Sequence, residues 1–220
     1  MGRFRAFYGS MIGKKAVMGV TGLIGIGFVI LHALGNLLVF RGPDAINSYS
    51  RFLKGTGEVL WGLRIVLIVA VILHVTAAVQ LTRQSRAARP IGYAKTERQA
   101  ATTASRTMRW GGALLLLFIV LHILHFTTGT IRPAGTFSAD DVYSNVVLSF
   151  RIWWVALFYV VSMIALGLHL FHGAWSSVRS IGASRESPAP LHHRISLALA
   201  ILIWAGFTAI PVAVFAGLVR

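Results

Sequence analysis

Histidines are the residues of this sequence whose types and spacing could do chemistry. The chain of 220 residues has eight histidines, against six Asp and Glu residues and no cysteine. Six of the histidines lie inside strongly apolar stretches: His32, His74, His122, His125, His169 and His172. An ionisable side chain in such a stretch usually faces the protein interior and marks a functional site. The missing cysteines exclude disulfides, Cys-ligated iron–sulfur clusters and thiol nucleophiles within this chain.

The apolar stretches that carry these histidines are long enough to cross a bilayer, which takes about 20 helical residues. There are five of them, at residues 16–40, 59–81, 110–130, 152–175 and 195–218. A helix satisfies its own backbone hydrogen bonds in hydrocarbon. With 56% hydrophobic and only 12% charged residues, the chain is unlike an average soluble domain. The sequence therefore predicts an all-α membrane protein, a five-transmembrane-helix bundle that forms one integral membrane domain over residues 1–220.

The basic residues predict the orientation of this bundle. Fourteen Lys and Arg residues lie in the segments before the first span, between the second and third, and between the fourth and fifth, whereas six lie on the opposite side. Short cytoplasmic segments carry the excess of positive charge, so we expect a cytoplasmic N-terminus and an external C-terminus. The net charge of +15 is then an orientation signal, and no nucleic-acid partner is expected. His192 and His193 are expected on the surface, in the last cytoplasmic loop.

With this orientation, the helical rise of about 1.5 Å per residue places the buried histidines in two layers. His32 on the first span and His122 on the third form an outer pair. His74 on the second span and His169 on the fourth form an inner pair. Each pair comes from two different helices, and each layer offers two imidazoles.

Two facing imidazoles suit bis-histidine ligation of haem b, which fills both axial positions and favours electron transfer over oxygen chemistry. Zinc would usually require four ligands in a tight tetrahedron. A lone buried histidine is more often a hydrogen bond between helices, but four of them in matched layers favour two haems b, with the haem iron bound by His32, His74, His122 and His169.

Several neighbouring residues have more than one interpretation. His125 and His172 each follow a proposed ligand by three residues, so they are candidates for alternative ligands, propionate partners, quinone contacts or proton carriers. Arg64 and Arg151 could pair with an outer haem propionate or extend to the membrane interface. Gly19, Gly22 and Gly25 would let either a macrocycle or a neighbouring helix approach closely.

Specific motifs add a family resemblance that spans nearly the whole chain. They are SMIGKKAVMGVTGL (10–23), LHALGNLLVF (31–40), INSYSRFL (46–53), LWGLRIVL (60–67), RQSRAARPIGY (83–93) and LHLFHGAWS (168–176). With these motifs the chain resembles the cytochrome b558 family, the membrane-anchor subunits of bacterial succinate dehydrogenases and fumarate reductases. The resemblance implies a five-helix anchor with two haems and one histidine ligand on each of the first four helices.

The resemblance also implies which histidines are ligands and which partners bind. The spacing from Gly112 favours His122 over His125, and the spacing to the Gly-x-Trp-Ser segment favours His169 over His172. The implied partners are an FAD flavoprotein subunit, an iron–sulfur subunit, membrane lipid and a quinone, with menaquinone favoured over ubiquinone. The implied location is the bacterial cytoplasmic membrane, with the basic loop after residue 82 as a docking surface. Where a quinone-site glutamate is expected in the second span, this chain has Arg64, and Glu58 lies at the outer edge.

Two other functions remain compatible with the residues alone. The cytochrome b anchor of a hydrogenase or formate dehydrogenase also has histidines on several helices. A small transporter or a haem-free scaffold would need no haem, although the inverted repeats and broken helices of many transporters are not seen in this sequence. In each case this chain lacks the catalytic machinery for succinate, since it has neither a nucleotide-binding loop nor a cysteine.

Overall fold

The structure is a computed structural model that describes residues 2–88, 103–180, 182 and 190–220. Within these residues it is helical, without strands. Five long helices make up the body of the molecule: α2 (Met11–Asn36), α4 (Glu58–Ala87), α5 (Thr103–His122), α7 (Trp153–Ser180) and α8 (Pro190–Phe215). Each of them contains a stretch that is long and apolar enough to span a membrane. For the described residues, the prediction of an all-helical fold with five helices able to span a membrane is therefore confirmed.

The long helices extend beyond the predicted spans, mostly at their basic ends. Helix α4 continues through Arg83 and Arg86 to Ala87, and α5 begins at Thr103, seven residues before the predicted start. Hydropathy marks only the part of a helix that lies in hydrocarbon. Arginine is a good helix former and its charged end reaches water from an interfacial turn, so the helix itself need not end where the apolar run ends.

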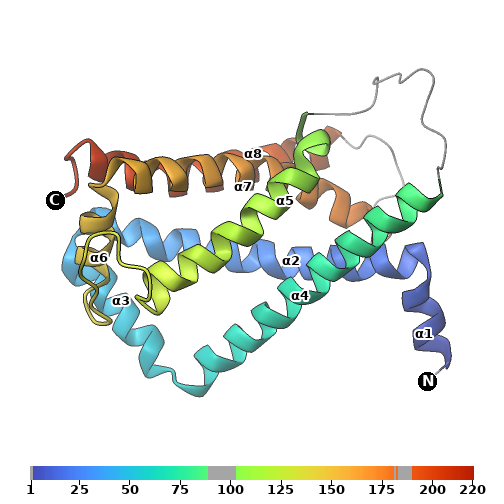
Figure 1. Cartoon of the computed structure of the whole chain (residues 1–220), viewed down its shortest axis with the longest axis horizontal. Helices are drawn as coiled ribbons and strands as arrows, with labels where there is room; N and C mark the ends of the chain where they lie inside the picture. Colours follow the sequence, from blue (N-terminus) through green and yellow to red (C-terminus); the bar gives the residue numbers. More distant parts are fainter. Residues whose placement is uncertain (1, 89–102, 181, 183–189) are drawn as a thin grey trace.

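Three shorter helices, which the apolar pattern did not predict, lie outside the spans: α1 (Gly2–Gly9), α3 (Pro43–Gly55) and α6 (Val142–Phe150). Helix α3 follows the 3-10 turn η1 (Leu37–Arg41) and begins with a proline after Gly42, whose φ of +93° favours glycine. Helices α3 and α6 pack together at the end of the bundle that holds the C-terminus (Figure 1). The N-terminus, the end of α4 and the beginning of α5 lie at the opposite end (Figure 1).

The helix packing brings together the spans that carry histidines. Helix α7 packs against α2, α5 and α8, whereas α4 packs mainly on α2. One apolar core, around Val39, Phe150 and Val214, closes the end near α3 and α6. A smaller core around Ala33, Leu170 and Ile203 joins α2, α7 and α8 in the middle of the bundle. Large apolar side chains on the outer surface, such as Leu63 and Ile72 of α4, are more than half exposed, as lipid-facing positions require.

Candidate functional site: two layers of paired histidines

The predicted outer pair comes together between α2 and α5. The ring centroids of His32 and His122 are 5.8 Å apart, and the two ring planes are nearly perpendicular, at 84°. Aromatic rings surround the pair: Phe28 stacks on His32 with a centroid distance of 5.1 Å, and Phe118 stacks on His122 at 5.4 Å. His122 is the last residue of α5, immediately before a single π-helical turn, η2 (Ile123–Thr127).

The predicted inner pair comes together between α4 and α7. The ring centroids of His74 and His169 are 6.2 Å apart. The Nδ1 atom of His74 lies 3.1 Å from the carbonyl oxygen of Met18 and 3.2 Å from the Thr21 hydroxyl, both on α2. A carbonyl oxygen only accepts hydrogen bonds, so Nδ1 of His74 carries the proton. The lone pair of the ring is then on Nε2, which is the atom left to bind a metal.

The two pairs lie at different depths along the bundle. The inner pair is level with Thr21 of α2, and His32 follows Thr21 by eleven residues on the same helix. At about 1.5 Å per residue, this separates the layers by roughly 16 Å. Helix α7 gives the same result, because Tyr159, which contacts His122, precedes His169 by ten residues, roughly 15 Å. The structure thus places His32 with His122 and His74 with His169 at two separate levels, which is the pairing that the sequence predicted.

The geometry of both pairs fits one iron atom between two imidazoles. With metal–nitrogen bonds of about 2 Å, two rings bound to opposite sides of one metal have centroids roughly 6 Å apart, close to the 5.8 Å and 6.2 Å found here. The Nδ1 atom of His169 is buried without a hydrogen-bond partner among the described residues. Glycines clear space beside the inner pair: a Cβ atom at position 22 would lie 3.4 Å from His74 Cε1, and one at position 112 would lie 3.8 Å from His169 Cε1.

A different kind of metal site finds no support in the described part of the chain, where no three His, Cys, Asp or Glu side chains come together in a way that could hold a metal ion. The imidazoles occur in pairs instead. Two protein ligands per metal are too few for a structural zinc site, but they are the number that a haem iron needs, because the macrocycle supplies the other four nitrogens.

His125 does not join the outer pair, because both of its ring nitrogens are already hydrogen-bonded. Its Nε2 atom lies 2.9 Å from the Ser149 hydroxyl, and its Nδ1 atom lies 3.0 Å from the Tyr159 hydroxyl. The same Tyr159 hydroxyl lies 3.4 Å from Nδ1 of His122. Sequence spacing left both His122 and His125 as possible partners of His32. In the structure His122 lies against His32, whereas His125 is bonded to Ser149 and Tyr159.

The π turn explains why spacing alone did not reveal these contacts. Residues three apart in an α-helix lie on roughly one face, but η2 adds a residue to its turn, with the Thr128 N–H bonding to the Ile123 carbonyl 3.0 Å away. Such turns are rare and frequently occur at functional sites. Sequence reasoning also missed Tyr159 and Ser149. The only signal available was a hydroxyl-bearing side chain in an otherwise apolar stretch.

His172 lies in a different environment, at the end of α7 that is near the start of α8. Its ring is 6.3 Å from that of Trp175 and it makes no pair with His74. His193 lies close by, with its ring 4.8 Å from Phe171 and 6.2 Å from Trp175. The expectation that His192 and His193 lie in a surface loop is wrong: both belong to the first turns of α8 and are half-buried, because α8 begins before its apolar run does.

The two arginines proposed as propionate partners have different surroundings. The Arg64 guanidinium lies 5.0 Å from the ring centroid of Trp61, one turn earlier on α4, a cation–π contact on the lipid-facing side. Arg151 is exposed and caps the C-terminal end of α6. Neither arginine contacts a histidine pair. The basic residues Arg89, Lys95 and Arg98 of the expected docking loop lie outside the described residues.

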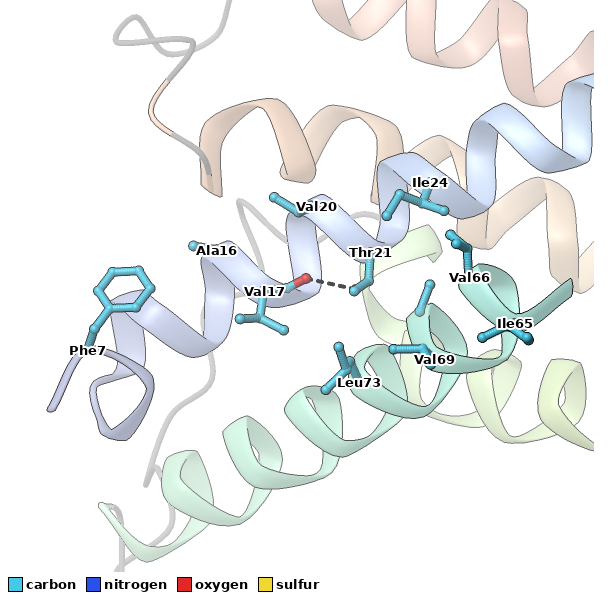
Figure 2. Close-up of a pocket in the computed structure, with 11 residues that line it drawn as sticks. Phe7, Ala16, Val17, Val20, Thr21, Ile24, Ile65, Val66, Val69 and Leu73 are labelled. Atoms are coloured by element: carbon cyan, nitrogen blue, oxygen red, sulfur yellow. Dashed lines mark hydrogen bonds between the residues drawn. The ribbon is translucent and has the colours of Figure 1, made fainter. Parts of the chain in front are cut away.

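A groove of about 510 Å³ opens beside the inner pair, between α1, α2 and α4. Figure 2 shows Val17, Thr21 and Ile24 of α2 facing Ile65, Val69 and Leu73 of α4 across it. Thr21 is the only polar residue among the described residues that line it, and its hydroxyl already donates to the Val17 carbonyl oxygen at 2.8 Å. The groove therefore suits an apolar chain and offers no free hydrogen-bonding group to a quinone head.

Comparison with known proteins adds no relative. No family model matches the chain, and neither a curated protein nor a solved structure matches it. The function of this chain is therefore inferred from its residues and their geometry.

Proposed function

We propose that this chain is the di-haem cytochrome b anchor of a succinate:quinone oxidoreductase, a succinate dehydrogenase or fumarate reductase of the bacterial cytoplasmic membrane. The observation that carries the proposal is the arrangement of four histidines as two facing pairs, each drawn from two helices. The motifs shared with cytochrome b558 subunits support the particular complex.

In this proposal the residues of the chain bind, orient and insulate two haems b. His32 and His122 hold the outer one, and His74 and His169 hold the inner one. Bound haem b would exchange single electrons between its ferric and ferrous states. The aromatic rings around His122 and the apolar helix faces exclude water from both layers. Met18 and Thr21 fix the tautomer and ring orientation of His74.

The rest of the relay belongs to partner chains. Because this chain has no cysteine, an iron–sulfur subunit must deliver electrons to the inner layer, and an FAD flavoprotein subunit must act on succinate. Both would dock on the end of the bundle that carries the N-terminus and most basic residues. Electrons would then pass between the inner and outer layers and a membrane quinone, for which menaquinone is favoured by the family resemblance.

Haem content tests this proposal directly. The purified chain is expected to show the reduced-minus-oxidised bands of low-spin haem b, with two haems per chain by pyridine haemochrome assay. His32→Ala or His122→Ala should remove one haem and leave the other, and His74→Ala should remove the second one alone. His172→Ala is the matched control, because this residue lies three positions from His169 yet makes no pair with His74. It should retain two haems.

Three results would contradict the proposal. A purified chain without haem would favour a scaffold or transporter. Equal loss of both haems in every single variant would contradict two independent layers. Co-purification with a nickel or molybdenum subunit, in place of flavoprotein and iron–sulfur subunits, would favour the anchor of a hydrogenase or formate dehydrogenase.

A further inference from the structure

A continuous chain of hydrogen bonds begins at Nδ1 of His122. It consists of Ser149, His125, Tyr159 and His122, with successive separations of 2.9, 3.0 and 3.4 Å. Ser149, His125 and Tyr159 are 4%, 7% and 8% exposed. These hydrogen bonds connect α6, the π turn η2 and α7. Because they are buried, each of them acts in a low dielectric and is stronger than in water.

The direction of each hydrogen bond follows once His122 binds a metal through Nε2. Its Nδ1 then carries the proton and donates to the Tyr159 oxygen. The Tyr159 hydroxyl can in turn donate to Nδ1 of His125. Nε2 of His125 then carries the proton and donates to the Ser149 oxygen. Every group therefore has a role that its chemistry allows, and the chain runs in one direction, away from the metal.

We propose that Tyr159, His125 and Ser149 are positioning residues that fix the ring of His122 and lower the reduction potential of the outer haem. This inference rests on the proposed function, since it requires His122 to be a haem ligand. A histidine that donates its second N–H to an acceptor becomes a more basic ligand. The Tyr159 oxygen is a better acceptor when its own hydroxyl donates onward to His125. A more basic ligand stabilises ferric iron relative to ferrous iron, and the potential falls.

Within the described residues the hydrogen bonds of the inner pair go to Met18 and Thr21 of α2 and include no tyrosine or further histidine, so the two layers are unequal. His74 donates to a backbone carbonyl of α2, and Nδ1 of His169 has no hydrogen-bond partner among the described residues. The hydrogen-bond chain at His122 thus acts on one layer alone. The inner haem is therefore an internal reference in any measurement on the full chain.

The test is a redox titration of the purified chain with both haems bound, in which each haem is followed by its optical bands and its low-spin EPR signal. Tyr159→Phe removes the central hydroxyl and keeps the ring. We expect the preference of the outer haem for ferric over ferrous iron to fall about tenfold, on the order of the smallest effects of outer partners on metal affinity. A tenfold change corresponds to a rise in potential of about 59 mV for a one-electron couple. The inner haem should not change.

A second variant tests the inference if Tyr159→Phe disturbs the structure around the outer pair. Ser149→Ala breaks the hydrogen-bond chain at its far end and should raise the outer potential by a smaller amount, while Ser149→Thr should restore it. Ser162→Ala is the matched control, because this fully buried serine of α7 donates to the Phe158 carbonyl oxygen at 2.8 Å and, among the described residues, is bonded to neither histidine pair. It should leave both potentials and both EPR signals unchanged.

The possible outcomes separate the two proposals. If Tyr159→Phe loses the outer haem, a raised potential in Ser149→Ala supports the inference and an unchanged one overturns it. Unchanged outer potentials in both Tyr159→Phe and Ser149→Ala overturn it and leave the two-haem function standing. A wild-type chain without haem overturns both.

Discussion

His122 and His125 differ by three positions in sequence, and their neighbours give them different roles. Nδ1 of His122 has one partner and its ring faces His32, whereas both nitrogens of His125 are bonded to hydroxyls. The chemistry of a histidine depends on which ring nitrogen is left unprotonated and unbonded. That property is set by the atoms around the ring, and these come from other helices.

Asp141, at the end of the bundle that holds α3 and α6, is a surface residue whose pKa also depends on its neighbours. Its Oδ1 atom accepts hydrogen bonds from the Ser144 N–H at 3.1 Å and from Asn47 Nδ2 at 3.0 Å. It thereby caps α6 and connects it to α3. Hydrogen bonds from the side chain and backbone of Ser144, and from Asn47, hold the pKa of Asp141 below its ordinary value of 3.8.

We predict that Asp141→Ala lowers the free energy of unfolding by about 1 kcal/mol at neutral pH, the usual value of an N-cap. A carboxyl whose pKa is depressed in the folded state contributes stability above its unfolded pKa and loses it as the pH falls through the folded pKa. The difference between wild type and variant should therefore shrink below pH 3.8. Thermal unfolding in detergent at several pH values measures it.

Asp140→Ala is the control for this prediction. Asp140 is adjacent in sequence and makes an exposed ion pair with Lys54, at 3.5 Å. Exposed pairs contribute about 0–1 kcal/mol, so this variant should be close to wild type. Equal losses in the two variants, or a difference for Asp141→Ala that does not change with pH, would show that the cap does not stabilise α6.

At the scale of the elements, the corner between α1 and α2 depends on close backbone contact. Ser10 caps α2, accepting from the Gly13 N–H at 2.9 Å, and its hydroxyl donates to the Phe7 carbonyl oxygen at 2.7 Å. Lys14 Nζ donates to the carbonyl oxygen of Gly9. A Cβ atom on Gly13 would overlap the Phe7 carbonyl group, which is backbone and cannot rotate away.

Gly13→Ala should therefore displace α1 and lower the free energy of unfolding by about 1–3 kcal/mol, the usual cost of overpacking. Gly27→Ala is the matched control in the same helix, because a Cβ atom there would meet nothing within 4 Å. It should leave stability unchanged or raise it by up to about 1 kcal/mol. Thermal unfolding in detergent compares the two, and limited proteolysis reports release of α1. Equal stability of both variants would contradict the close contact.

At the scale of the whole molecule, the bundle separates two unlike ends. Short helices α3 and α6 cover one end, and the N-terminus with the basic ends of α4 and α5 forms the other (Figure 1). The positive-inside rule assigns the basic end to the cytoplasm. Because the chain has no cysteine, single cysteines can be introduced without removing native ones.

We predict that Thr136→Cys reacts with a membrane-impermeant maleimide on intact cells, and that Ser85→Cys reacts only after the membrane is opened. Both positions are exposed, at opposite ends of the bundle. Labelling measured by gel shift or mass spectrometry decides the orientation. The reverse pattern would place the histidine layers at inverted depths and would contradict docking of partner subunits on the basic end.

The choice between His122 and His125, and between His169 and His172, came from the tertiary structure. The sequence by itself determined the five apolar stretches and the two levels at which their histidines lie. These features follow from apolar length and helical rise, which are local properties of the chain. It did not determine α1, α3 and α6, because short helices outside the membrane have mixed composition and are stabilised by contacts such as those of Asp141 and Gly13.

Only the tertiary structure decided what surrounds each histidine. The π turn after His122, the approach of Tyr159 from α7 and of Ser149 from α6, and the contact of His74 with Met18 all join residues that are far apart in sequence or off the regular helical period. Depth in a membrane is encoded along one helix, so it can be read from a sequence. Hydrogen-bond partners depend on how helices rotate and pack against each other, which is settled only when all of them are in place.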